Sequence, residues 1–288
     1  MPLFSMSEIL RQAQENKYGV GHFESWNLES TRAVIRAANE ERSPVIFGFN
    51  GTIMEERGRD LEYYAAIGRV AVEKARIPIA LILNEASSFE QVVRGIRCGF
   101  SAVMIDGSNL PFENNIELTR KVVEVAHAVG VSVEGQLDEL PHAKAGIFGE
   151  KLTENQMTNP DRARDYVNET GIDALSVSVG NVHVMYARQA EIDTDRVREI
   201  ARATRIPLVI HGATSIADDS IKRAIESGIC KVNIGTALRS AFAEGIRTSG
   251  ASGSYVDPEL ILESGELQLK EFVRAKMRVY GSSGKSKV

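Results

Sequence analysis

The sequence has little that would mark a secreted, membrane-bound or nucleic-acid-binding protein. Its 288 residues include only two cysteines, Cys98 and Cys230, so we expect reduced thiols in a cytoplasmic protein rather than a disulfide scaffold. No apolar run approaches the roughly 20 residues of a membrane span. The N-terminal segment has no basic stretch before an apolar core, which argues against a signal peptide. The 39 acidic and 34 basic residues are mixed, without the basic block typical of nucleic-acid partners.

What remains is an ordinary globular composition, with 43% hydrophobic and 25% charged residues. The length fits either two domains of about 150 residues or one large α/β barrel of about 250 residues. The order of the elements along the chain decides between these two possibilities.

Eight short apolar runs recur along the chain, and each is typical of a buried parallel strand. They are residues 19–23, 44–49, 78–83, 102–107, 132–137, 174–180, 207–212 and 229–235. Segments with helical periodicity lie between them, for example residues 28–41 and 112–129.

This alternation predicts a (β/α)8 TIM barrel over residues 1–250. A doubly wound open sheet is the alternative, but no GxGxxG motif follows the first strand. Residues 251–280 are expected to form a short C-terminal helical extension of the same domain, and residues 281–288 a disordered tail. The long connection from residue 138 to 159 is typical of a functional loop over a barrel mouth.

Polar residues follow the predicted strands at their carboxyl ends, where such barrels build their active sites. They are His22, Glu24, Asn50, Asn84, Glu85, Asp106, Glu134, Gln136, His183, His211 and Asn233. A single histidine after an apolar run is more often a packed core residue than a ligand. Here, however, Glu85, His183 and His211 together supply two imidazoles and one carboxylate, a set that suits a divalent metal with open coordination positions.

Small polar residues follow the last two strands. Gly212 and Thr214 come after the seventh, and Gly235 and Thr236 after the eighth. Loops at these places often bind phosphate through backbone N–H groups, although small residues also make tight βα turns.

The sequence resembles the class II, metal-dependent fructose-bisphosphate and tagatose-bisphosphate aldolases from about residue 2 to residue 245. The most specific matches are residues 87–137, PLVIHGATSI (207–216) and AIESGICKVNIGTALRSAF (224–242). The resemblance implies a lyase that uses a divalent metal, most often Zn²⁺ but also Mn²⁺, Co²⁺ or Fe²⁺. It also implies a homodimer or homotetramer, with His183 and His211 as retained zinc ligands.

The sequence departs from that family where the chemistry is expected. The family motif His-Leu-Asp-His-Gly after the third strand reads Ile82-Leu83-Asn84-Glu85-Ala86 here. Asn84 therefore replaces the acid/base Asp, and Glu85 replaces a zinc His. Asp106 and Glu134 match family acidic positions, whereas Gln136 replaces a family Glu. The first strand carries His22 and Glu24 in place of Ala and Asn, and Val184 and Ala213 replace glycines of the phosphate site.

These residues lead to one main hypothesis and two alternatives. The main hypothesis is a metal-dependent lyase that cleaves a ketose, ketose phosphate or sugar-acid derivative through a metal-stabilised enediolate. Asn233 would orient the intermediate, Asn84 would hydrogen-bond it, and Glu24, His22 or a loop residue would replace the missing acid/base. A metal-dependent sugar epimerase or isomerase and an inactive metabolite-binding homologue are the alternatives.

Overall fold

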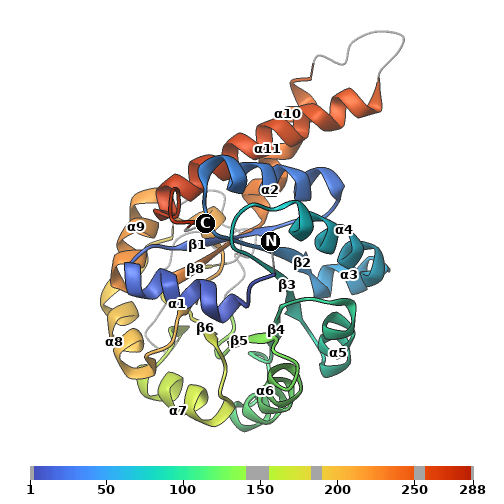
Figure 1. The fold of residues 1–288 in the computed structure, drawn as a ribbon. Coiled ribbons are helices and arrows are strands. Elements are labelled where there is room, and N and C mark those ends of the chain that lie inside the picture. Colours follow the sequence, from blue (N-terminus) through green and yellow to red (C-terminus); the bar gives the residue numbers. More distant parts are fainter. Residues whose placement is uncertain (1–2, 141–155, 183–189, 250–256, 287–288) are drawn as a thin grey trace, which may run out of the picture.

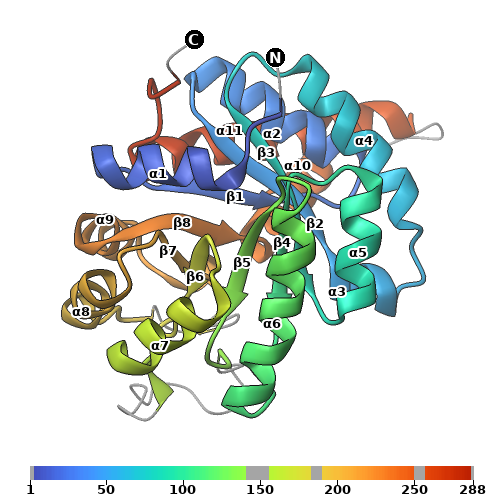
Figure 2. The same ribbon diagram turned by 60° about the horizontal axis from the view of Figure 1, so that its bottom comes forward.

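The computed structural model describes residues 3–140, 156–182, 190–249 and 257–286, in which eight parallel strands form a closed barrel. Each strand pairs with the next in the sequence, and the last pairs with the first (Figures 1 and 2). The strands are β1 (Val20–Glu24), β2 (Val45–Asn50), β3 (Ile79–Ala86), β4 (Ala102–Asp106), β5 (Ser132–Gln136), β6 (Ala174–Ser176), β7 (Leu208–Ile210) and β8 (Ile229–Ile234). All eight predicted strands are present, so the predicted (β/α)8 fold is confirmed.

The helices surround the barrel, except for the first (Figure 1). They are α1 (Met6–Asn16), α2 (Leu28–Glu41), α3 (Gly51–Glu56), α4 (Leu61–Lys74), α5 (Phe89–Cys98), α6 (Phe112–His127), α7 (Pro160–Thr170), α8 (Thr194–Thr204), α9 (Asp218–Ser227), α10 (Thr236–Arg247) and α11 (Pro258–Tyr280), with the short 3-10 helix η2 (Ala213–Ser215). The predicted helix over 28–41 matches α2, and the one over 112–129 corresponds to α6.

The core has two layers, one outside the barrel and one inside it. Outward side chains such as Phe47 and Leu81 pack beneath the helices. Inward side chains such as Ile46 and Met104 pack with Met6 and Leu10 of α1, which lies across the end of the barrel where the strands begin (Figure 1). Because α1 fills that end, the cavity that could admit a substrate lies at the opposite, carboxyl end of the strands.

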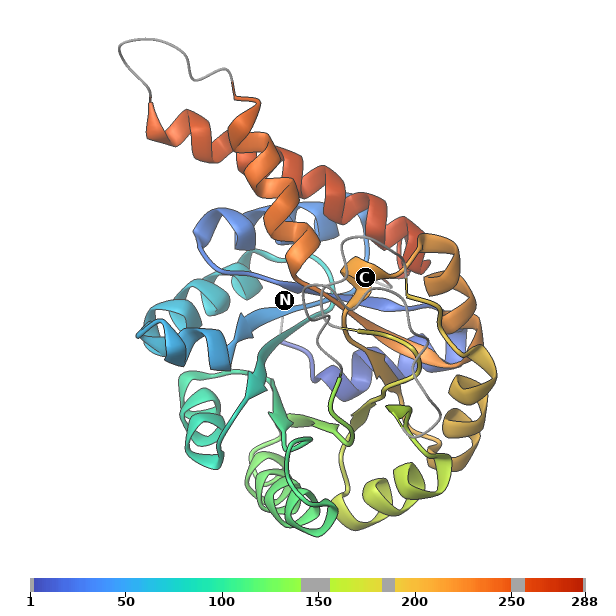
Figure 3. The ribbon, with the colours of Figure 1, turned by 180° about the vertical axis from the view of Figure 1, so that it is seen from behind.

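Helices α10 and α11 lie side by side and extend beyond the barrel as an arm (Figures 1 and 3). From Glu266 onward, α11 is held against α2 by ion pairs. Arg274 and Arg278 both contact Glu41, at 2.9 Å and 2.6 Å, and Arg36 contacts the buried Glu266 at 2.9 Å. The predicted C-terminal extension is therefore a single long helix attached to the barrel wall.

The sequence predicted a disordered tail over 281–288, and this is wrong for residues 281–286. The backbone N–H of Gly284 donates to the Glu41 carbonyl at 2.8 Å, and that of Ser286 donates to the Arg42 carbonyl at 2.9 Å. Ser282 is buried against Ser43, with 2.7 Å between the two hydroxyl oxygens. The end of α2 offers free carbonyl groups, which a composition-based prediction cannot detect.

Two further predictions concern the long connection after β5 and membrane-spanning helices. Most of the long connection after β5, including His142, lies outside the described residues, so its predicted role as a functional loop stays a prediction. A search of the described helices finds none with the length and apolar character needed to cross a membrane.

Candidate active site

A cavity of about 180 Å³ opens at the carboxyl end of the barrel. It is lined by side chains from β1, β2, β3, β7 and β8 and from the loops that follow them. The structure brings together at this cavity most of the predicted site residues, namely His22, Glu24, Asn84, Glu85, His211, Gly212, Thr214, Asn233, Gly235 and Thr236. Asn50, Ile53, Ile234 and Arg239 complete the lining.

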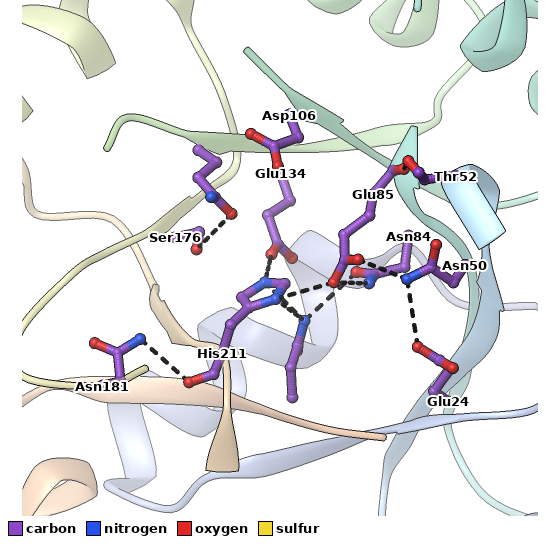
Figure 4. A network of polar contacts seen from close by, with 12 residues as sticks. Glu24, Asn50, Thr52, Asn84, Glu85, Asp106, Glu134, Ser176, Asn181 and His211 are labelled. Carbon is purple, nitrogen blue, oxygen red and sulfur yellow. Dashed lines mark hydrogen bonds and ion pairs between the residues drawn. The ribbon is translucent and has the colours of Figure 1, made fainter. Parts of the chain in front are cut away.

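His211 is held at the floor of this cavity by a buried chain of charges (Figure 4). Its Nε2 lies 2.9 Å from Oε1 of Glu134, whose Oε2 accepts from the Lys231 ammonium at 2.6 Å. Lys231 and Glu134 are fully buried, and His211 nearly so. The Asn181 side chain donates to the His211 carbonyl at 3.1 Å and fixes its backbone. A buried ion pair of this kind requires both partners, because either charge alone would be left uncompensated.

The pKa directions follow from this chain. Burial alone would raise the pKa of Glu134, but Lys231 and His211 outweigh it, so the pKa lies below its ordinary value. Burial lowers the pKa of Lys231 despite its pairing with Glu134. For His211 burial acts downward, but hydrogen bonds to Glu134 and Glu85 prevail, and the pKa is raised above 6.5. Glu134 is therefore a carboxylate that can orient and polarise the imidazole.

Glu85 faces His211 from the other side of the cavity (Figure 4). Its Oε1 lies 3.5 Å from Nδ1 of His211 and accepts from the Asn84 amide at 3.0 Å. Its Oε2 accepts from the Asn50 amide at 2.5 Å. The backbone of Glu85 is left-handed, with φ of 51°, and its carbonyl accepts from the Thr52 hydroxyl at 2.7 Å. This conformation is uncommon for a residue with a side chain, and such strain is concentrated at functional sites.

His22 lies beneath the same cavity with an exposed fraction of 1%. Neither ring nitrogen makes a hydrogen bond of normal geometry within the described residues, although the Asn233 side chain lies near enough to act on the pKa of His22. Burial, reinforced by the positive charges of Lys231 and His211, lowers its pKa well below 6.5. His22 is therefore a neutral imidazole, with one N–H and one lone pair that ligand atoms could use.

Glu24 and Arg239 form the rim of the cavity between β1 and α10. The Arg239 guanidinium donates to Oε1 of Glu24 at 2.7 Å and lies over the Trp26 ring, 4.7 Å from its centre. Glu24 Oε2 also accepts weakly from the Asn50 amide at 3.5 Å. Burial raises the pKa of the Glu24 carboxyl, although Arg239 opposes this shift.

The loops after β7 and β8 contact each other as well as the cavity. The Thr214 hydroxyl accepts from the backbone N–H of Ala237 at 3.0 Å, so one N–H of the first turn of α10 already has a partner. The Asn233 side-chain amide lies 2.7 Å from Nε2 of His211 and 3.4 Å from Oδ1 of Asn84. Asn233 therefore connects the two sides of the site.

The remaining predicted residues lie elsewhere. Glu134 lies behind His211, away from the cavity surface. Asp106 and Gln136 share the hydroxyl of Ser108, which donates to Asp106 at 2.6 Å and lies 3.3 Å from the Gln136 amide nitrogen. Neither of them lines the cavity. His183 falls outside the described residues, as does Val184.

Sequence reasoning missed two residues of the site, Lys231 and Arg239. A lysine within the apolar run ICKVNI was a usable signal, because a lysine buried in a barrel strand requires an acidic partner. Arg239 gave no comparable signal, since an arginine in the first turns of a helix is ordinary and its partner Glu24 is distant in the sequence.

The donor set fits a divalent ion in part. No group of three or more His, Cys, Asp or Glu residues within the described ranges is arranged to hold one. Two donors do converge, since Nδ1 of His211 and Oε1 of Glu85 are 3.5 Å apart. Two atoms bound tetrahedrally to one zinc ion at about 2.1 Å are about 3.4 Å apart. Metal-binding histidines commonly have a carboxylate on the ring nitrogen that does not bind the ion, and Glu134 stands in that place at Nε2 of His211. The other nitrogen, Nδ1, lies near Glu85 at 3.5 Å and the Asn233 amide at 3.2 Å, and it is the one that would bind an ion.

Comparison with known proteins places the chain in a family. The family model for "Fructose-bisphosphate aldolase class-II" matches residues 4–285. A "Probable fructose-bisphosphate aldolase" of Bacillus subtilis is 38% identical, over 99% of this chain and 100% of the relative. A "Fructose-bisphosphate aldolase" of Geobacillus stearothermophilus is also 38% identical, over 99% of each chain. The crystal structure of the YdjI aldolase from Escherichia coli K12 superposes with a TM-score of 0.88 at 29% identity, covering 99% of this chain and 100% of that one.

A parallel eight-stranded barrel with a histidine and a carboxylate converging at its carboxyl end is typical of metal-dependent barrel enzymes. The chain belongs to the class II fructose-bisphosphate aldolase family. It is accordingly a metal-dependent aldolase-type lyase, and its relatives favour this over the epimerase and the inactive homologue.

Proposed function

We propose that this lyase cleaves the carbon–carbon bond beside a ketone in a ketose, ketose phosphate or sugar-acid derivative, with Glu85, His183 and His211 holding one divalent ion. The observation that carries the proposal is the 3.5 Å approach of Glu85 Oε1 to His211 Nδ1, with Glu134 behind the other ring nitrogen. His183, outside the described residues, is assigned to the third position through its sequence motif. Zn²⁺ suits two imidazoles and one carboxylate, and Mn²⁺, Co²⁺ or Fe²⁺ are the alternatives.

A bound ion would polarise the substrate ketone and offset the negative charge of the enediolate left after cleavage. We expect Asn233 to orient that intermediate, because its amide lies between His211 and Asn84. Asn84 has no ionisable proton and contributes a hydrogen bond.

The proton of the cleaved hydroxyl group needs a base, and its return needs an acid. Glu24 is our first candidate, because it lines the cavity and its raised pKa keeps a proton available closer to neutral pH. His22 is the second, as a neutral imidazole whose nitrogens make no hydrogen bond of normal geometry within the described residues. A Glu24→Gln variant that retains full activity would transfer the role to His22.

The small residues Gly212, Thr214, Gly235 and Thr236 are proposed to contact the substrate, including a phosphate group if one is present. All four line the cavity. Asp106, Glu134 and Gln136 do not line the cavity. We propose that they support the site indirectly, Glu134 through its contact with His211, and Asp106 and Gln136 through the Ser108 hydroxyl.

The arm formed by α10 and α11 is our candidate for subunit contact in a homodimer or homotetramer. It extends past the barrel, and Leu260 and Leu267 of α11 are 61% and 44% exposed (Figure 3). Light scattering coupled to size-exclusion chromatography measures the mass of the assembly, and the mass of a single subunit would contradict a dimer or tetramer.

We propose that residues 1–250 and 251–280 form one domain and that the enzyme acts in the cytoplasm.

Metal content is the direct test of the proposed site. The purified protein is expected to carry one divalent ion per chain by elemental analysis, and His211→Ala and His183→Ala are expected to carry almost none. His127→Ala is the matched control, because His127 is partly exposed and pairs with Asp173 far from the cavity. Unchanged metal content in either site variant would overturn the proposal. Cleavage is assayed by mass spectrometry on a panel of ketoses, ketose phosphates and sugar acids.

A further inference from the structure

Arg239 is a cationic side chain at a cavity that is otherwise rich in acids and amides. Among the residues that line this cavity in the described part of the chain, it is the one lysine or arginine, whereas Glu24 and Glu85 are both acidic. Within the described lining, Arg239 is therefore the fixed positive charge that a substrate anion can reach.

The guanidinium is held in place from two sides. One N–H group donates to Glu24 at 2.7 Å, and the planar group lies over the indole of Trp26 at 4.7 Å. Trp26 is itself fixed edge-on against Phe242, with 5.6 Å between ring centres. Phe242 lies three residues after Arg239 on α10, so both contacts are built on one rigid helix. A cation oriented in this way loses little freedom when it binds a ligand.

Most of the hydrogen-bonding capacity of Arg239 is unused. A guanidinium has five N–H donors. Within the described residues its side chain donates to one acceptor, Glu24, and it remains 34% exposed at the cavity rim. The fork of two parallel N–H groups matches the two oxygens of a carboxylate or a phosphate.

The neighbouring helix start offers less than its position suggests. In the first turn of α10, the N–H of Ala237 donates to Thr214, and the N–H groups of Leu238 and Arg239 donate to the Gly235 carbonyl. An anion at this side of the cavity would therefore find its strongest donor in the Arg239 side chain. A purely structural role explains the group poorly, because partly exposed ion pairs stabilise proteins only slightly.

We infer that Arg239, oriented by Trp26 and Glu24, binds one oxyanionic group of the substrate, a carboxylate or a phosphate, at the rim of the cavity between β1 and α10. The inference rests on the proposed lyase function for the identity of the substrate, but the anion site itself does not depend on cleavage. Arg239 is thus a specificity-determining residue.

The test uses open-chain compounds that contain no ketone and cannot be cleaved. Isothermal titration calorimetry on the purified full chain, with and without added Zn²⁺, compares D-gluconate, D-glucitol 6-phosphate and uncharged D-glucitol at constant ionic strength. At least one of the two anions is expected to bind roughly 10- to 100-fold more tightly than glucitol, the range for charge-assisted hydrogen bonds. The stronger of the two anions identifies the group as carboxylate or phosphate.

Arg239→Gln is expected to remove this preference, and Arg239→Lys to retain part of it through its charge. Arg247→Gln is the matched control, since Arg247 lies on the same helix, is 73% exposed and pairs with Glu244. It should leave the preference unchanged. Equal affinity of all three compounds for the unmodified protein, or an anion preference that survives in Arg239→Gln, would overturn the inference. If Arg239→Gln does not fold, Arg239→Lys alone must show a reduced preference.

The outcome is separable from that of the proposed function. Loss of the metal-content prediction with an intact, Arg239-dependent anion preference would reject the lyase site and keep the anion site. An enzyme that binds its metal and cleaves a ketose, but shows no anion preference, would reject the inference alone.

Discussion

The two sides of the barrel mouth are built differently. On the side of β5, β7 and β8, Glu134, His211 and Lys231 are nearly or fully buried and hold one another through short contacts. On the side of β1 and β3, Glu24 and Glu85 are partly accessible, and Glu85 has a left-handed backbone. The buried side is therefore constrained by its own electrostatics, whereas the accessible side can accept different polar groups.

The departures from the family motifs follow this division in part. Two replaced residues, Glu24 and Glu85, belong to the accessible side. Three others, His22, Asn84 and Gln136, are replaced although they are buried. His211 and Glu134, which match family positions, belong to the buried side. A change there would leave a charge without its partner. On the assignment proposed above, the chain keeps His211 and Glu134 of the metal site and differs from its family in several of the groups proposed to handle the substrate.

The largest loss of stability is expected from a substitution on the buried side. Replacing Lys231 with Met removes the ammonium partner of the buried Glu134 and leaves only His211 beside it, and we expect a loss of about 3–5 kcal/mol in the free energy of unfolding, measured by urea titration. Lys121→Met is the control, because Lys121 and its partner Glu117 are both 60% exposed and should contribute less than about 1 kcal/mol. A similar small change in both variants would show that the buried charges are not coupled as described.

A substitution on the accessible side should lower activity rather than stability. Glu24→Gln keeps the shape of the side chain but cannot accept a proton, and we expect kcat for cleavage to fall by about 100-fold or more. Cleavage needs Glu24 as a base, so the rate should rise as the pH rises through the pKa of Glu24, which burial raises. The variant should lose this rise from its pH–rate profile. A profile of unchanged shape would assign the rise to another group.

The contribution of Glu85 can be compared directly with that of the buried side. Glu85→Gln should weaken metal affinity by at least about tenfold, the lower limit reported for losing even an outer-shell partner. Glu244→Gln, at an exposed position on α10, is the control. The affinity is measured by competition with a chelator. An unchanged affinity in Glu85→Gln would limit the metal site to the histidines.

The smallest expected effect is a pH dependence of stability in the metal-free protein. Hydrogen bonds to Glu134 and Glu85 overcome burial and raise the pKa of His211 above 6.5, so the folded state holds this proton more tightly than the unfolded state. The resulting stability is fully present below pH 6.5 and is lost as the pH rises through the raised pKa. His22 has the opposite effect, because its pKa is lowered. Its contribution to stability is present above pH 6.5 and is lost as the pH falls below that value.

Urea titrations at several values above pH 6.5 should therefore show a decline in stability that His211→Asn flattens. An equal decline in both proteins would mean that another group is responsible.

The fold was predictable from the sequence because most strands are apolar almost throughout and each is separated from the next by a helical segment. The same reasoning failed at residues 281–286, where polar composition suggested disorder. Their order comes from carbonyl groups at the end of α2, more than 230 positions earlier in the chain. A pattern within one segment contains no information about such a partner.

The site was predictable to a different depth on its two sides. Strand ends identified His211 and Glu85, because side chains at the carboxyl ends of barrel strands must converge. The sequence did not reveal that Lys231 supports Glu134 or that Arg239 pairs with Glu24, because these contacts depend on which strands and helices become neighbours in the closed barrel. The left-handed backbone of Glu85 was equally invisible, as residue identity gave no indication of positive φ.

The central claim, that Glu85 replaces a histidine as a metal ligand opposite His211, is tested most directly by anomalous diffraction from crystals of the zinc-loaded protein. One zinc ion is predicted within about 2.0–2.2 Å of both a Glu85 carboxylate oxygen and a His211 ring nitrogen. An ion bound without Glu85, or no anomalous peak at this end of the barrel, would contradict it.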